Sequence, residues 1–154
     1  MIDKPDSQSL QNILDKISEI PSQSDSQKIE TWKKLYGALS QITHDLRQSG
    51  QSSEINEQII HLAYHNNWWA RTTVAKYLYD NPDVTRLSIL FDLAHDSFNL
   101  CKEYAISGLI RYGNPALSYI IKLRDEIEEK GADFSPDHMK YFILLRDAIR
   151  QIQK

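Results

Sequence analysis

The chain has 154 residues, of which 41% are hydrophobic and 25% are charged, and its formal net charge is −3. These values are typical of one soluble globular domain, and they exclude a protein that binds nucleic acid or anionic membranes through a globally basic charge. A single cysteine, Cys101, excludes an internal disulfide bond. We find no signal peptide and no apolar run of membrane-spanning length, so a cytoplasmic protein with no membrane partner is expected.

Helical spacing of apolar residues recurs along the chain, whereas the alternation typical of strands is nearly absent. The first apolar stripe predicts a helix that stops at Pro21, and the polar linker SQSDSQ follows it. A longer amphipathic helix is predicted over residues 28–48. Ser53 is a suitable N-cap for a third helix that extends to about residue 65.

The rest of the chain continues as short helices joined by turns that contain Gly or Pro. The predicted segments are 68–80, 84–95, 99–112, 115–130 and 136–152. Ser135 followed by Pro136 is typical of a cap and a first helical position. Eight helices joined by short turns predict an all-α fold built from antiparallel helical hairpins.

The middle of the chain matches itself at an offset of 31 residues, with segment 59–78 aligned on segment 90–109. Apolar, small and basic residues recur at the same positions in both segments. The pairs are Leu62 with Leu93, Ala63 with Ala94, Trp69 with Leu100, Arg71 with Lys102, Val74 with Ala105, Ala75 with Ile106, and Leu78 with Leu109. A fixed period with two helices per unit is typical of α-solenoids.

The second of these segments, with the turn that follows it, resembles a HEAT repeat. The HEAT pattern has an Asp, an apolar–basic pair, a small residue and a Leu before a Gly-containing turn. In DSFNLCKEYAISGLIRYGNPAL these positions are Asp96, Cys101, Lys102, Ala105, Leu109 and Gly113. The preceding unit departs from the pattern, with His65 for the Asp and Pro82 for the Gly.

The resemblance implies a right-handed, HEAT-like α-solenoid of about four antiparallel helical hairpins. We expect one domain over residues 1–154, with HEAT-like repeats in 54–130. Residues 1–52 would supply N-terminal capping helices, and residues 136–154 a C-terminal capping helix, because solenoids need their ends covered.

Two tryptophans, Trp68 and Trp69, stand side by side at the start of a predicted helix. Adjacent side chains on a helix point about 100° apart, so one narrow apolar stripe does not easily hold both rings. Trp69 aligns with Leu100 and is predicted to lie in the core. Trp68 aligns with the polar Asn99, so it either packs against helix 28–48 or contacts a partner protein.

The HEAT resemblance implies a non-enzymatic module that binds another protein on the solenoid surface. An adaptor or inhibitor is expected, including a bacterial immunity protein that neutralises a toxin, by analogy at the level of the family. No cofactor is expected, and the oligomeric state is left open. The predicted partner-binding residues are Trp68, Arg71, Lys76, Lys102 and Arg111, while Tyr104, Tyr112 and Tyr119 are interpreted as mixed core and rim.

A metal-dependent enzyme is one alternative. His61 and His65 lie four residues apart, which would place them on one helical face. The repeat offset sets Asp92 and Asp96 at the matching positions of the next unit, and two His with two Asp can ligate zinc or iron. The simpler interpretation makes these residues polar parts of hairpin turns, so no metal is expected.

Two further alternatives rest on resemblance. LAHDSFN resembles the His–Asp motif of HD-type phosphohydrolases through His95 and Asp96, but it lacks the usual apolar–Gly continuation. HEAT-like DNA glycosylases grip DNA with a basic concave face, on which Arg71 and Lys102 would hold equivalent positions. A ladder in which these two cations pair with Asp96 is the preferred interpretation, so nucleic acid is not the expected partner.

Overall fold

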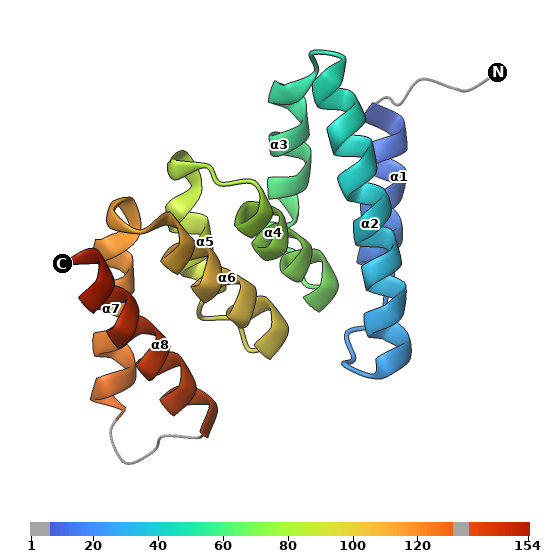
Figure 1. The fold of residues 1–154 in the computed structure, drawn as a ribbon. Coiled ribbons are helices and arrows are strands. Elements are labelled where there is room, and N and C mark those ends of the chain that lie inside the picture. Colours follow the sequence, from blue (N-terminus) through green and yellow to red (C-terminus); the bar gives the residue numbers. More distant parts are fainter. Residues whose placement is uncertain (1–6, 131–135) are drawn as a thin grey trace. The chain divides into compact units, whose positions relative to one another are not determined.

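The computed structural model describes residues 7–130 and 136–154. Within these ranges it contains eight α-helices and no strand, which confirms the predicted all-α class and number of helices. The helices are α1 (Ser7–Ser18), α2 (Ser26–Gln48), α3 (Ser52–Ile60), α4 (Trp68–Asp80), α5 (Leu87–Leu93), α6 (Asn99–Tyr112), α7 (Leu117–Glu129) and α8 (Pro136–Ile152) (Figure 1). Short 3₁₀ turns cover His61–Tyr64, Val84–Arg86 and Asn114–Ala116. None of the described helices is both long and apolar enough to cross a membrane.

The third helix differs from its prediction at both ends. Its α-helical part begins at Ser52 after the N-cap Gln51, so the prediction of Ser53 as the N-cap is wrong. The helix ends at Ile60, His61–Tyr64 form a 3₁₀ helix, and His65 is extended with a ψ of 150°. The predicted cap Ser135 of the last helix lies outside the described residues.

Contacts divide the chain into two compact units, residues 1–74 and 75–154, and the boundary falls within α4. In the first unit α1 packs along α2, and both helices contact α3. The buried apolar side chains of this unit include Leu10, Leu14, Ile17, Trp32, Leu39, Leu46, Ile55, Ile59 and Trp69. The prediction of one domain over the whole chain stays a prediction.

Trp69 lies in the core of the first unit, as predicted, and has no exposed surface. Its ring centroid lies 5.7 Å from that of Trp32, and its indole N–H donates to the Pro21 carbonyl oxygen at 3.0 Å. The Trp32 indole N–H donates to Thr73 Oγ1 at 2.9 Å. Trp69 therefore packs on Trp32 in the core, and the indole N–H donors of both rings are satisfied.

Asn67 joins the start of α4 to the end of the first hairpin. Its Oδ1 accepts from the backbone N–H groups of Trp69 at 2.8 Å and Ala70 at 3.1 Å, which are otherwise unsatisfied donors of the first turn. Its Nδ2 donates to the Ile20 carbonyl oxygen at 2.6 Å. One amide thus caps α4 and holds the segment just before Pro21.

Replacing Asn67 by Ala should lower the free energy of unfolding by about 1–2 kcal/mol, because a helix cap and a hydrogen bond are both lost. Asn67→Ser keeps a capping oxygen but is too short to reach Ile20, so it should fall between wild type and the Ala variant. Urea unfolding followed by tryptophan fluorescence checks this order. Equal losses for Ser and Ala would show that the cap contributes nothing.

In the second unit, α5 packs on α6 and α7 packs on α8, while α6 also contacts α7 and α8. In Figure 1, α6 and α8 lie in front of α5 and α7. Gly108 lets α5 and α6 approach closely, since a Cβ there would lie 3.3 Å from Leu90 Cδ1. Gly113 ends α6 with a φ of 70°, a conformation that favours glycine.

The burial pattern recurs at the offset of 31 residues predicted from the sequence. In five matched pairs, both members are buried: Ala63 with Ala94, Ala70 with Cys101, Val74 with Ala105, Ala75 with Ile106, and Leu78 with Leu109. Trp69 and Leu100 differ, because Trp69 is buried and Leu100 is half-buried. The repeated residues therefore occupy similar environments even where the side chains differ in size.

Candidate protein-binding site

A hollow of about 240 Å³, here called the tyrosine pocket, lies between the end of α4 and α6 in the second unit. Its lining residues are Tyr79, Leu100, Glu103, Tyr104 and Ser107. Four of them follow the spacing i, i+3, i+4, i+7, which places them on one face of α6. The two half-buried tyrosine rings have centroids 6.3 Å apart and planes inclined by 56°.

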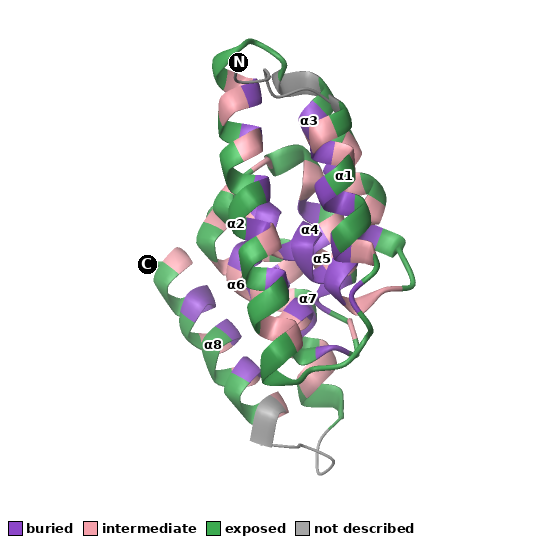
Figure 2. Ribbon diagram, turned by 90° about the vertical axis from the view of Figure 1, so that its right-hand side faces the viewer, coloured by how far each residue is buried: buried purple, intermediate pink, exposed green. Residues whose placement is uncertain are grey.

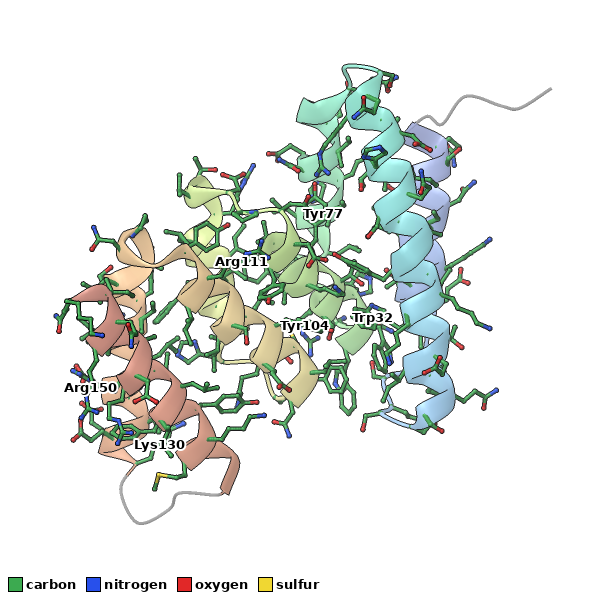
Figure 3. All side chains as sticks on the ribbon, in the orientation of Figure 1. Trp32, Tyr77, Tyr104, Arg111, Lys130 and Arg150 are labelled. Atoms are coloured by element: carbon green, nitrogen blue, oxygen red, sulfur yellow. The ribbon has the colours of Figure 1, made fainter. Side chains whose placement is uncertain are left out.

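Two of the predicted binding cations lie at this pocket. Lys76 Nζ is 5.4 Å from the Tyr104 ring centroid and 2.9 Å from Asp80 Oδ2. Arg111 Cζ is 5.1 Å from the Tyr79 ring centroid, and its Nη1 donates to the Tyr79 carbonyl oxygen at 2.9 Å. Figure 3 shows Tyr104 and Arg111 along one side of α6. These contacts hold the two cations against the tyrosine rings that line the pocket.

Burial raises the pKa of the Tyr104 phenol above its usual value of 10.0, because desolvation disfavours the phenolate, and the nearby Lys76 ammonium opposes this effect. Tyr112, whose hydroxyl oxygen accepts from the Asp83 backbone N–H, has a pKa raised by burial for the same reason. Both tyrosines are therefore neutral hydrogen-bonding groups at physiological pH.

The raised pKa of Tyr104 predicts a loss of stability in alkali. As the pH rises above 10.0, the unfolded chain releases this proton before the folded chain does, so the free energy of unfolding falls. Urea unfolding between neutral and alkaline pH should show this decline, and Tyr104→Phe should reduce its slope. An unchanged slope in the Phe variant would contradict the assignment to Tyr104.

Lys102 lies at a different hollow, of about 90 Å³, on the side of α6 that meets α7 and α8. Its Nζ is 6.0 Å from the Tyr141 ring centroid. In the same hollow, His95 Nε2 lies 2.6 Å from Glu126 Oε2, while His95 Nδ1 is 2.8 Å from the Phe91 carbonyl oxygen. Because that carbonyl oxygen can only accept, Nδ1 is the donor in this hydrogen bond.

The two remaining predicted residues belong to the first unit. Trp68 is half-buried, and its backbone N–H donates to Ser22 Oγ at 3.2 Å. The Arg71 guanidinium donates through Nη1 to the carbonyl oxygens of His65 at 2.8 Å and Asn66 at 3.0 Å, so it closes the turn before α4. The structure thus brings Lys76 and Arg111 together at the tyrosine pocket, and places Lys102 at a second hollow.

Two of the four residues proposed for a metal site, His65 and Asp96, accept backbone hydrogen bonds in turns. His61 and His65 do not share an α-helical face, because the α-helix ends before them; this expectation is wrong. His65 Nδ1 accepts from the Asn67 N–H, and Asp96 Oδ1 accepts from the Phe98 N–H before α6, as a turn residue does. No group of three or more His, Cys, Asp or Glu suited to a metal occurs among residues 7–130 and 136–154.

Searches of protein-family models, curated proteins and solved structures find no match to this chain. The site is therefore characterised by its own geometry. The sequence predicted Lys76 and Arg111 as binding residues, which stays a prediction, and it did not predict the pocket lined by the two tyrosines that they contact. The available signal was the spacing of Leu100, Glu103, Tyr104 and Ser107 on one face of α6.

Proposed function

We propose that this chain is a non-enzymatic module that binds another protein through the tyrosine pocket of its second unit. The observation that carries the proposal is a hollow lined by two half-exposed tyrosines, one of which packs against the Arg111 guanidinium. Tyrosine and arginine are enriched among residues that dominate binding energy at protein interfaces. The rings offer apolar area with little conformational entropy to lose, since contacts with cations already hold them.

The partner expected at this pocket carries an apolar or aromatic side chain beside a carboxylate. The tyrosine rings and Leu100 form apolar walls for the first group. The exposed Arg111 guanidinium provides donors for the second, at the rim rather than in the interior. Such an arrangement binds and orients a peptide segment, and it requires no bond-forming chemistry from the module.

We further propose that the helices stack as a right-handed, HEAT-like α-solenoid. Two contacts in the second unit support stacking at the sequence period. His95 pairs with Glu126, and Lys122 Nζ lies 5.1 Å from the Phe91 ring centroid; each pair is separated by 31 residues. Helix α5 and the turn after it therefore contact α7 through residues one period apart, as neighbouring repeats of a solenoid do.

The finer biological roles stay predictions. An adaptor or an inhibitor, including a toxin-neutralising immunity protein, has the same requirement for a protein-binding surface. Trp68 and Arg71 stay predicted contacts on the first unit, and Lys102 stays one on the second. Single-stranded nucleic acid also stacks on aromatic rings beside cations, so it is the competing ligand class that the experiment must separate.

The proposal is tested by replacing Tyr104 with a photo-crosslinking phenylalanine derivative in cells of the source organism. The matched control carries the same derivative at Tyr64, which is 68% exposed and lies in the first unit. We expect a discrete protein adduct at position 104 that is absent at position 64 and is lost on adding Arg111→Ser. No protein adduct at position 104, or a nuclease-sensitive adduct, would overturn the proposal.

A further inference from the structure

Helix α8 exposes an apolar face on the side away from its own core. Tyr141, Leu145, Ala148 and Ile149 are buried, and α8 packs mainly against α7. On its other side, Met139, Ile143 and Leu144 are 44%, 39% and 40% exposed. Three of the five exposed large hydrophobic residues in the described chain thus lie within two turns of one helix, which makes a patch rather than scattered exposure. Figure 2 shows α8 with separate buried and exposed faces.

Opposite charges stand at the two ends of this patch. Lys140 and Asp147 are both exposed and seven residues apart. Seven residues make almost two helical turns, so these side chains lie within about 20° of each other around the axis and about 10 Å apart along it. Ile143 and Leu144 lie midway between them, one on each side of the line that joins them.

This face is complementary to itself when two copies run antiparallel. A two-fold axis between Ile143 and Leu144 places Lys140 of one copy opposite Asp147 of the other, and the same contact forms twice. Ile143 then meets Ile143, and Leu144 meets Leu144. A parallel pair would set Lys140 against Lys140 and Asp147 against Asp147, which like-charge repulsion opposes.

We infer that α8 mediates reversible homodimerisation through an antiparallel contact of the Lys140, Ile143, Leu144 and Asp147 face. The existing partners of the two charges do not prevent this. Lys140 Nζ is 3.3 Å from Glu103 Oε1, and Arg146 Nη2 is 3.3 Å from Asp147 Oδ1, with all four side chains at least 40% exposed. Exposed ion pairs contribute little and are readily shared or exchanged.

The dimer is expected to be weak. A stable interface buries about 1,600 Å² in total, and a contact made by one helix face of this length is smaller. The association should therefore depend on protein concentration, with monomer and dimer in rapid exchange. The dimer contact lies on α8, whereas the tyrosine pocket lies on α4 and α6, and the two meet at the Lys140–Glu103 pair, because Glu103 lines the pocket.

The test is sedimentation equilibrium of the full chain over a range of concentrations. We expect a monomer–dimer equilibrium for wild type and a dissociation constant raised by about tenfold or more in Lys140→Glu and in Asp147→Lys. Lys34→Glu, the same charge change at an exposed position on α2, is the matched control and should dimerise as wild type does.

The mixture of the two variants provides the decisive measurement. Lys140→Glu and Asp147→Lys chains, each weak alone, should form a heterodimer when mixed, because both contacts then join opposite charges. The Lys140→Glu/Asp147→Lys double variant should recover homodimerisation for the same reason. A wild type that is monomeric at every concentration, or a mixture no tighter than the separate variants, would overturn the inference.

Discussion

Replacing Trp69 by Ala is expected to lower the free energy of unfolding by about 3–5 kcal/mol, the largest effect of any substitution considered. The ring is fully buried and packs on Trp32, so its removal leaves a cavity in the core of the first unit. The substitution also removes the 3.0 Å hydrogen bond from the Trp69 indole N–H to the Pro21 carbonyl oxygen. Cavity and lost hydrogen bond act in the same direction.

The matched control is Trp68→Ala, which removes the same side chain one position earlier. Trp68 is only half-buried, so Trp68→Ala should lower the free energy of unfolding by much less than Trp69→Ala does. Urea unfolding followed by far-ultraviolet circular dichroism measures both variants without relying on the tryptophan signal that they alter. Equal costs for Trp68 and Trp69 would contradict the assignment of one ring to the core.

Leu78→Ala and Leu109→Ala are each expected to lower the free energy of unfolding by about 2–5 kcal/mol. The two leucines are 1% and 0% exposed, and they are separated by the 31-residue period. Since both lie in the last turns of equivalent helices, α4 and α6, their losses should agree within about 1 kcal/mol. Such agreement would show that matched positions of the repeat contribute similar packing energy as well as sharing the same place in the helix.

Ile110→Ala serves as the control, because Ile110 neighbours Leu109 on α6 but is half-buried. Its cost should be clearly smaller than that of Leu109→Ala in the same urea unfolding experiment. If Leu109→Ala lowers the free energy of unfolding strongly and Leu78→Ala hardly at all, the two positions are not equivalent, even though both are buried.

The helices of this chain were predictable because their signals are local. Apolar spacing and Gly or Pro between segments located all eight helices of the described residues, with ends that differ by a few residues. The end of α3 was not predictable in this way. Its change to a 3₁₀ turn before His65 leaves no break in the apolar pattern of the segment IIHLAY.

The repeat also assigned Trp69 to the core in advance, through its alignment with Leu100, while the role of Trp68 stays a prediction. It could not supply Trp32 as the packing partner, which comes from a helix outside the aligned segments. The same limit applied to Asn67, whose bond to the Ile20 carbonyl oxygen joins residues 47 positions apart.

The proposed binding site also combines features that the sequence predicted with features that only folding creates. Composition and periodicity identified an all-helical chain in which the cations Arg71 and Lys102 occupy matched positions near the start of the repeated helices. The tyrosine pocket depended on tertiary structure, because the ring of Tyr79 meets Tyr104 only when α4 and α6 pack together. Helical periodicity determines which residues share a face of one helix, whereas the contacts between faces of different helices form only on folding.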